Sequence, residues 1–480
     1  MALPETARHG RPLWTAAEAA AATGGRATAT WAAEGVSIDS RSLVPGDLFV
    51  ALVGPNFDGH DFIGAALAAG AAAALAGRTP AGLPAGAPLL LVEDTLAALV
   101  ALGAAARRRA TARFIAVTGS VGKTGTKEAL RLALESQGST FASAGNLNNH
   151  WGVPLSLARL SRDAAYGVFE LGMNHAGEIR PLTRQVRPEV AIITAVGPVH
   201  LEFFASVEAI ADAKAEIFEG VTPGGAAILN RDSPLYERLA GKARDCGIGR
   251  VIGFGRHAAA EARLIDCSID ATGSEVDGIV LGERVRYRIG MPGLHWAINS
   301  LAVLAAVQAI GGAVAPAAAA LARLTPLKGR GQRLRIAGPA GAFEVIDESY
   351  NASPPAMRAA IAVLGRATPG RGGRRLAVLG DMLELGGAAP RLHAELADEL
   401  GAAEVAQVFT AGPLMAALHD ALPAARRGAH ADDARRLVPA VVDAVRGGDV
   451  VLVKGSLGSR MAQIVEALRA LDRARAANGN

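Results

Sequence analysis

One short segment constrains this chain more than any other: the turn TGSVGKT at residues 118–124, between an apolar run and a helical pattern. Residues 114–117 have the length and composition of a buried strand, and residues 127–134 are typical of a helix. At such a turn, glycines let backbone N–H groups surround phosphate oxygens, and the helix N-terminus adds the positive end of its dipole. Lys123 can reach the outer phosphates, and the Thr124 hydroxyl can bind Mg²⁺. The segment therefore predicts a site that binds ATP and uses its terminal phosphate.

The loop is a tighter form of the general nucleotide-binding pattern, because Val117 stands where that pattern has a glycine. A glycine-rich turn with an incidental lysine is the alternative interpretation. We favour phosphate binding, because strand, turn and helix all fall where the mechanism needs them. The expected ATP contacts in the loop are Thr118, Gly119, Ser120, Val121, Gly122, Lys123 and Thr124.

Length and composition indicate a globular protein of several domains. The chain has 480 residues, of which 50% are hydrophobic and 20% charged, with a formal net charge of +4. The longest run of basic residues is Arg107-Arg108-Arg109, which we interpret as a solvated linker rather than a nucleic-acid site. No nucleic-acid partner is expected.

The cysteines and the apolar segments favour a cytoplasmic location. Cys246 and Cys267 lack the spacing of a metal site, which suits a reducing compartment. The first ten residues have no apolar run typical of a signal peptide. Residues 62–77 lack charge but are mostly Ala and Gly and too few to cross a bilayer, so we expect a packed helix there and no membrane span.

Alternating strand and helix patterns divide the chain into three α/β blocks, at residues 1–108, 109–324 and 325–480. The middle block is expected to form a parallel sheet with helices on both faces, and its phosphate loop lies at a strand's C-terminal end, where such sheets bind ligands. The third block reads as a second doubly wound unit. The glycine-rich residues 328–331 are a candidate hinge.

Three polar residues follow the phosphate loop at or near expected strand ends. Glu170 closes one apolar run and is suitably placed for Mg²⁺, although a capping or salt-bridged glutamate is the alternative. His200 follows the next run, and Lys214 lies on a helix. Taken singly, the last two are more often ordinary surface or core residues than ligands.

Ordered motifs along the chain carry a resemblance to a known family. They are TGSVGKT, NLNNHWGVPLSL, ELGMNHAGEI, TAVGPVHLEFF, AKAEIF, LNRD, GLHWAIN, GRGQR, IDESYNASP, LGDMLELG and VLVKGS. With SIDSR, PGDLFVAL and FDGHDF nearer the N-terminus, they cover residues 36–461 and resemble the Mur ligases of bacterial cell-wall synthesis. Gly125 departs from the threonine expected after Thr124.

The resemblance implies three domains: an N-terminal domain for a uridine nucleotide, a central ATPase domain, and a Rossmann-like domain for the incoming amine. The N-terminal motifs are similar to those of the member that joins D-Ala-D-Ala to a UDP-N-acetylmuramoyl-tripeptide. The expected reaction is ATP-dependent amide formation through an acyl phosphate, carried out by a monomer.

The same resemblance implies roles for the residues at the strand ends. Lys123 would stabilise the transferring phosphoryl group, and Thr124 and Glu170 would hold one Mg²⁺. His200 and Lys214 would serve a second Mg²⁺, with Lys214 carbamylated by CO₂, which turns a cation into an oxygen donor. Carbamylation needs the neutral amine, so a lowered pKa of Lys214 is expected.

Further contacts are carried over by motif. Asn299 would contact the adenine, Arg330 would reach the phosphates from the third domain, and either Asp347 or Glu348 would bind the ribose. Ser40, Arg41, Asp58 and His60 would surround the uridine diphosphate. Asn148 and Asn149 would touch the muramoyl peptide, and Tyr350, Asn351 and Lys454 would position D-Ala-D-Ala. For each of these substrate contacts, a structural turn role is about as plausible.

Three rival functions were weighed. A ligase that adds the third amino acid carries a DNPR signature, which this sequence lacks. Folylpolyglutamate synthases share the central and C-terminal domains, but the uridine-type N-terminal motifs argue against them. A non-catalytic ATP-binding regulator would have no use for a second metal site.

Overall fold

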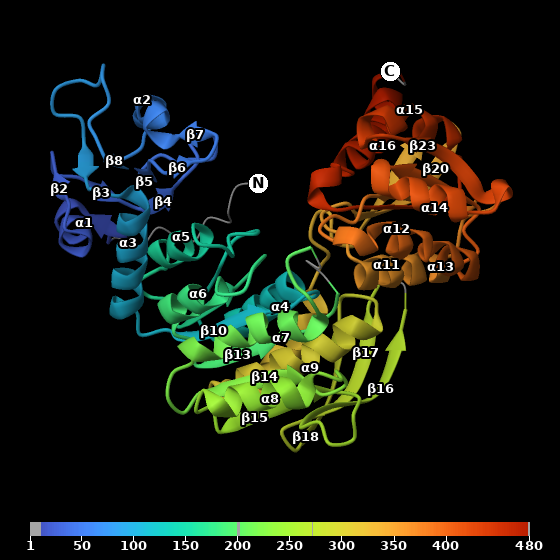
Figure 1. Cartoon of the computed structure of the whole chain (residues 1–480), viewed down its shortest axis with the longest axis horizontal. Coiled ribbons are helices and arrows are strands. Elements are labelled where there is room, and N and C mark those ends of the chain that lie inside the picture. The colour runs from blue at the N-terminus through green and yellow to red at the C-terminus, as the bar shows by residue number, and fades with distance from the viewer. Residues whose placement is uncertain (1–10, 199–201, 271, 479–480) are drawn as a thin grey trace.

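The computed structural model describes residues 11–198, 202–270 and 272–478, and it confirms a three-domain α/β architecture. Figure 1 shows the N-terminal and C-terminal domains as two arms on either side of the central domain. No helix in the described part of the chain is long and apolar enough to cross a membrane.

The N-terminal domain is built on a five-stranded sheet in the order β2-β9-β8-β5-β4. Its strands are β1 (Trp14–Thr15), β2 (Arg26–Ala27), β3 (Ala32–Ala33), β4 (Gly35–Ser37), β5 (Asp47–Val50), β6 (Val53–Gly54), β7 (Phe57–Asp58), β8 (Ala73–Ala76) and β9 (Leu89–Leu91). Its helices are α1 (Ala16–Thr23), α2 (Ile63–Ala68) and α3 (Thr95–Arg109). The domain docks on the central domain, where Trp14 Nε1 donates to the Ala158 carbonyl at 2.9 Å.

The central domain contains a nine-stranded sheet in the order β11-β12-β10-β13-β14-β15-β16-β17-β18. Its strands are β10 (Arg113–Thr118), β11 (Thr140–Ala142), β12 (Tyr166–Glu170), β13 (Val190–Ile193), β14 (Ala226–Asn230), β15 (Arg250–Gly255), β16 (Ala262–Ile269), β17 (Ser274–Val280) and β18 (Glu283–Ile289). Its helices are α4 (Lys123–Glu135), α5 (Gly152–Ala158), α6 (Ile179–Val186), α7 (Val207–Ala215), α8 (Tyr236–Asp245), α9 (Leu294–Ala309) and α10 (Val314–Ala320).

Helices cover both faces of this sheet because the apolar residues of its buried strands point alternately to each side. Ile115 and Val117 of β10 pack in one core with α4 and α9, and Phe114 and Ala116 pack in the other with α6, α7 and α8. The C-terminal ends of the parallel strands β10, β12 and β13 therefore share one edge, where polar side chains can meet.

The C-terminal domain has a six-stranded sheet in the order β19-β20-β24-β21-β22-β23, parallel except for β19. Its strands are β19 (Gln332–Gly338), β20 (Gly341–Glu348), β21 (Arg375–Gly380), β22 (Gln407–Ala411), β23 (Arg427–Ala431) and β24 (Val450–Lys454). Its helices are α11 (Pro354–Arg366), α12 (Ala389–Ala394), α13 (Leu396–Ala402), α14 (Ala416–Ala421), α15 (Ala434–Ala444) and α16 (Ala462–Asn478).

Three local predictions were wrong. The expected helix over residues 62–77 is a short helix, α2, followed by the buried strand β8. The central sheet is mixed: β16 pairs parallel with β15, but the pairs β16–β17 and β17–β18 are antiparallel. Residues 107–109 are the last turn of α3 and not a solvated linker: the Arg107 guanidinium lies 3.8 Å from the centroid of the Phe114 ring, and Arg109 lies 4.1 Å from that of Trp14.

Candidate functional site

The phosphate loop joins the end of β10 to the start of α4, and its backbone admits only glycine at two positions. Gly119 has φ +151° and Gly122 has φ +92°. A Cβ on Gly119 would lie 1.9 Å from Thr194 Oγ1, and one on Gly122 would lie 2.8 Å from Asn299 Nδ2. Ser120 N–H donates to the Ala195 carbonyl at 2.7 Å, which ties the loop to the neighbouring strand. Thr194 therefore packs against the loop at Gly119 and Asn299 packs against it at Gly122. The loop lies at the N-terminus of α4, where backbone N–H groups can bind an anion.

The side chains of Lys123 and Thr124 point to the same strand edge. Lys123 Nζ donates to the Gly119 carbonyl at 2.7 Å across the loop. Burial lowers the pKa of Lys123; the Glu170 carboxylate opposes that shift and the Arg330 charge adds to it. The charges of Glu170 and Arg330 therefore both act on Lys123.

Glu170 is placed as a metal carboxylate should be. It ends β12, pairs in register with Val117, and is 3% exposed. Its Oε2 accepts a hydrogen bond from the Thr124 hydroxyl at 2.8 Å. Among the described residues no group of three or more His, Cys, Asp and Glu gathers as a metal cage. A hydroxyl and one carboxylate nevertheless fit Mg²⁺, which is usually bound through few protein oxygens with substrate phosphates and water.

Asn148 and Asn149 both make protein contacts. Asn148 Nδ2 donates to Glu170 Oε1 at 2.8 Å. Asn149 Oδ1 accepts the backbone N–H groups of Trp151 and Gly152, at 3.2 and 2.9 Å, at the start of α5. Each side chain thus has a structural partner, and Asn148 is brought directly to the candidate metal site.

Lys214 lies in the last turn of α7 and is 2% exposed. Burial lowers its pKa well below the ordinary value, and the nearby charge of Lys123 lowers it further. Two residues on, Glu216 in the 3-10 helix η2 (Glu216–Gly220) accepts N–H groups of Gly177 and Arg180 at the start of α6, at 2.6 and 3.1 Å. The segment carrying Lys214 is therefore anchored to the loop that follows Glu170. His200, the predicted partner of Lys214, lies outside the described residues.

Residues of the third domain face this edge from the opposite side. The Arg330 guanidinium lies 4.2 Å from the centroid of the Tyr350 ring, and its charge acts on Lys123. The two domains touch where the Glu202 N–H donates to the Glu384 carbonyl at 3.3 Å. Arg330 is thus already near the phosphate loop in this arrangement.

The acidic pair at the end of β20 makes internal contacts. Asp347 is 1% exposed and accepts hydrogen bonds from the Ser349 hydroxyl at 2.6 Å and the Gly329 N–H at 3.1 Å. Glu348 pairs with Lys454 Nζ at 3.1 Å, and the same Nζ donates to the Asn351 carbonyl at 2.9 Å. Asp347 thereby holds the candidate hinge, and Glu348, Asn351 and Lys454 form one cluster at the strand ends.

The first turn of α9 packs across the first turn of α4. Asn299 approaches Gly122, and Trp296 lies over Gly125, where an added Cβ would come within 2.4 Å of the indole ring. Gly125 therefore has a structural reason: it leaves room for Trp296.

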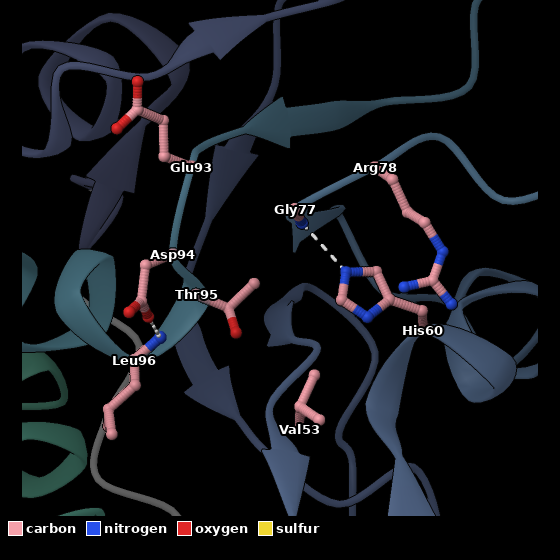
Figure 2. Close-up of a pocket in the computed structure, with 8 residues that line it drawn as sticks. All are labelled: Val53, His60, Gly77, Arg78, Glu93, Asp94, Thr95 and Leu96. Atoms are coloured by element: carbon pink, nitrogen blue, oxygen red, sulfur yellow. Dashed lines mark hydrogen bonds between the residues drawn. The ribbon is translucent and has the colours of Figure 1, made fainter.

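The N-terminal domain contains a cavity of about 500 Å³. Figure 2 shows His60, Gly77 and Arg78 on one side of it and Glu93, Asp94, Thr95 and Leu96 of the α3 N-terminus on the other, with Val53 below. Buried His60 accepts the Gly77 N–H at Nε2, 2.8 Å away, and its Nδ1 lies 2.6 Å from Asp58 Oδ1.

Asp58 also binds Arg78 at 2.9 Å. These hydrogen bonds, first from the His60 N–H and then from Arg78, hold the pKa of Asp58 well below its ordinary value. Ser40 and Arg41 are not among the lining residues, and Arg41 forks onto Asp39. Of the predicted residues, His60 lines this cavity, and Asp58 lies behind it as the partner of His60 and Arg78.

Sequence reasoning missed several residues of these sites. The start of α3 carried a readable signal, since Asp94 caps the helix by accepting the N–H groups of Leu96 and Ala97. Arg78 had none, because a single arginine in a glycine- and proline-rich loop is usually solvated. Lys127, fully buried in α4, also had none, because lysine is rarely buried.

Comparisons with known proteins agree along the whole chain. Sequence profiles match at residues 33–107 ("Mur ligase family, catalytic domain"), 117–307 ("Mur ligase middle domain") and 329–457 ("Mur ligase, glutamate ligase domain"). The UDP-N-acetylmuramoyl-tripeptide--D-alanyl-D-alanine ligase of Escherichia coli is 35% identical over 439 residues, covering 91% of this chain and 94% of that protein.

Two solved structures are similar over nearly the full length. A crystal structure of MurF from Acinetobacter baumannii has a TM-score of 0.81 at 28% identity, covering 95% of this chain and 99% of that one. The MurF ligase of Thermotoga maritima in complex with ADP has a TM-score of 0.75 at 28% identity, covering 92% and 98%. The resemblance inferred from the ordered motifs is confirmed.

Proposed function

The chain belongs to the Mur ligase family, and on that premise we propose that it joins D-Ala-D-Ala to the terminal carboxylate of a UDP-N-acetylmuramoyl-tripeptide, with hydrolysis of ATP to ADP and phosphate. Such a reaction builds a peptidoglycan precursor. The observation that carries the proposal is the meeting of Lys123, Thr124 and Glu170 at one strand edge, in a chain similar from end to end to ligases of that name. An enzyme that consumes ATP and a UDP-linked substrate acts where those nucleotides are made, so we place it in the cytoplasm. We also propose that it acts as a monomer.

The chemistry needs two anions brought together and water kept out. A carboxylate oxygen of the peptide attacks the γ-phosphorus of ATP, the bond from that phosphorus to the β–γ bridging oxygen breaks, and ADP leaves. The amine of D-Ala-D-Ala then attacks the carbonyl carbon of the acyl phosphate, loses a proton, and expels phosphate. Lys123 and Arg330 are the cations that would offset the negative charge of the approaching groups.

Thr124 and Glu170 would hold Mg²⁺, which would supply positive charge to offset the negative charge of the phosphates. Asn299, on α9 beside Gly122, is proposed to contact the adenine, and the loop backbone from Thr118 to Thr124 the phosphates. The ribose is assigned to Asp347 or Glu348; Glu348 is favoured because it is partly exposed, whereas Asp347 is buried and engaged with Gly329.

Lys214 is proposed to carry a carbamate and, with His200, to serve a second Mg²⁺. Burial supports this role, because a lysine held neutral can react with CO₂ and an ammonium cannot. A carbamate would also place an attracting anion near Lys123.

The substrate groups are proposed by domain. The cavity that includes His60, with Asp58 and Arg78 behind it, would take the uridine diphosphate, and the cluster of Tyr350, Asn351 and Lys454 would take D-Ala-D-Ala. The muramoyl peptide and ATP would then bind between them, at the C-terminal ends of the strands β10, β12 and β13.

The acyl phosphate gives the sharpest test of this function. The protein incubated with ATP, Mg²⁺ and UDP-N-acetylmuramoyl-tripeptide, but no D-Ala-D-Ala, should form a hydroxamate when hydroxylamine is added, because hydroxylamine captures activated carboxyl groups. Hydroxamate should not form without ATP. If the protein forms the amide with D-Ala-D-Ala but forms no hydroxamate when D-Ala-D-Ala is left out, an acyl phosphate that forms before the amine binds would be contradicted.

A further inference from the structure

We propose that Asn148 is a positioning residue for the Glu170 carboxylate, and that buried Lys127 holds in place the loop that carries Asn148. The inference rests on the proposed role of Glu170 at the magnesium ion. It adds to that site a residue that holds the carboxylate without binding the metal itself. This residue lies in the loop that follows β11, on the opposite side of β12 from β10.

The first step is the geometry of the carboxylate. Glu170 Oε2 accepts from the Thr124 hydroxyl and Oε1 accepts from Asn148 Nδ2, each at 2.8 Å. A carboxylate rotates freely about its last bond unless both oxygens are held. The Asn148 amide can engage only one oxygen, so it sets the plane of the group and leaves Oε2 beside the Thr124 hydroxyl, the other candidate metal ligand.

The loop that presents Asn148 is hydrogen-bonded to the end of β12 at Glu170 and again two residues later at Gly172. The Gly172 N–H donates to the Asn148 carbonyl at 2.8 Å, and the Glu170 N–H donates to Ser143 Oγ at 3.1 Å. A Cβ on Gly172 would lie 2.8 Å from Asn148 Cγ, so glycine is needed there for this close approach. The position of Asn148 is therefore tied to the strand that carries Glu170.

Lys127 ties the same loop to the helix of the phosphate loop. Its side chain is 0% exposed, and Nζ donates to the carbonyls of Ser143 at 2.6 Å and Gly145 at 3.4 Å, with Glu128 Oε1 at 3.2 Å. A buried ammonium is costly unless it is hydrogen-bonded and paired, and this one has both kinds of partner. Lys127 thus fixes residues 143–148 relative to α4 one turn after Thr124.

The contacts close a ring: α4 carries Thr124 and Lys127, Lys127 holds the loop, the loop's Asn148 holds Glu170, and Glu170 returns to Thr124. Partners that orient a metal ligand from outside typically affect metal affinity by about 10–100-fold when removed. The loss of Asn148 should therefore weaken metal-dependent nucleotide binding while leaving the phosphate cradle itself intact.

The experiment measures ADP binding to the full-length protein by calorimetry, once with Mg²⁺ and once with EDTA. Asn148→Ala should raise the Kd for ADP by about 10-fold or more with Mg²⁺ and leave it nearly unchanged in EDTA. Asn148→Leu keeps the number and branching of the side-chain heavy atoms without a donor and should behave in the same way. Asn146→Ala, an exposed residue of the same loop, is the matched control and should bind ADP as the unmodified protein does.

Two results would overturn the proposal. One is unchanged Mg²⁺-dependent binding in both Asn148 variants. The other is an equal loss with Mg²⁺ and with EDTA, which would assign Asn148 to the folding of the loop alone. Neither result involves the peptide or D-Ala-D-Ala, so a failure here is distinct from a failure of the proposed ligase activity, which phosphate release by the unmodified protein tests.

Discussion

At the scale of single residues, burial decides which lysine does what. Lys123 is half-buried and lies near the negative charge of Glu170, whereas Lys214 is fully buried with another cation as its neighbour. The Glu170 carboxylate opposes the lowering of the Lys123 pKa, whereas at Lys214 the neighbouring charge adds to the lowering caused by burial. This difference is the physical basis for assigning charge stabilisation to Lys123 and carbamylation to Lys214.

Lys214→Ala is expected to lose nearly all ligase activity, because it removes the oxygen donors that the carbamate would supply. A small carboxylate such as acetate, at high concentration, should restore part of it by supplying oxygens in the space left behind. The measurement is phosphate release with and without acetate. Lys242→Ala, at an exposed lysine of α8, is the control and should release phosphate as the unmodified protein does, with or without acetate. Full activity of Lys214→Ala without additives would exclude the carbamate.

The lowered pKa of Asp58 predicts a pH-dependent contribution to stability. A carboxyl with a lower pKa in the folded protein stabilises the fold above its unfolded pKa of about 3.9, and this stabilisation disappears as the pH falls through the folded pKa. Asp58→Asn should therefore lower the Tm at pH 7, and the difference from the unmodified protein should shrink from about pH 4 downward. Thermal unfolding from pH 7 to pH 3 measures this. A deficit that grows on acidification would contradict it, and Asp61→Asn, at an exposed neighbour, serves as control.

The sequence predicted the positions of residues that lie directly at the ends of recognisable strands and helices. The turn between β10 and α4 and the end of β12 follow from the strand pattern, so Lys123, Thr124 and Glu170 could be brought together without coordinates. The partners of Asn148 and Asn149 could not, because they depend on the path of an irregular loop. The burial of Lys127 was equally inaccessible, since its partners are backbone carbonyls that no side-chain pattern encodes.

At the scale of elements, the contact between α4 and α9 gives a prediction about Gly125. A Cβ there would meet the Trp296 ring at 2.4 Å, so Gly125→Thr overpacks the interface. Overpacking of this kind typically costs about 1–3 kcal/mol. Gly125→Thr should lower the Tm, and the double variant with Trp296→Ala should recover part of the loss, because the obstructing ring is gone. Independent, additive losses in a double-mutant cycle would show that the two residues do not share this space.

The strand pattern of the sequence identified the parallel strands well, since β10, β12, β13, β14 and β15 are continuous apolar runs. It missed β16, β17 and β18, whose outward residues are charged and face solvent, so no apolar run marks them. It also read residues 62–77 as one helix, because alanine is compatible with both α2 and the buried strand β8. Composition alone does not place the break between them.

At the scale of the whole molecule, the two arms lie on either side of the central domain (Figure 1). Arg330, at the start of the third domain, is near enough for its charge to lower the pKa of Lys123. The candidate hinge at residues 328–331 contains two glycines with positive φ, Gly329 and Gly331. Domain boundaries at 108 and 324 remain predictions that limited proteolysis can check.

Closure of the domains should be visible in solution. Addition of ATP and UDP-N-acetylmuramoyl-tripeptide should reduce the radius of gyration measured by small-angle scattering, because the negative charge of the nucleotide attracts Arg330 of the third domain. Arg330→Ala should show a smaller reduction. A radius that ligands leave unchanged in the unmodified protein would contradict closure.

The central claim is tested most directly by a phosphate-release assay in which UDP-muramoyl peptides of different length are crossed with D-Ala-D-Ala, lysine, diaminopimelate and glutamate as acceptors. The account predicts sustained phosphate release only when a UDP-N-acetylmuramoyl-tripeptide and D-Ala-D-Ala are present together with ATP and Mg²⁺. Release that depends on lysine or diaminopimelate with a UDP-muramoyl dipeptide, or that needs no acceptor, would contradict it.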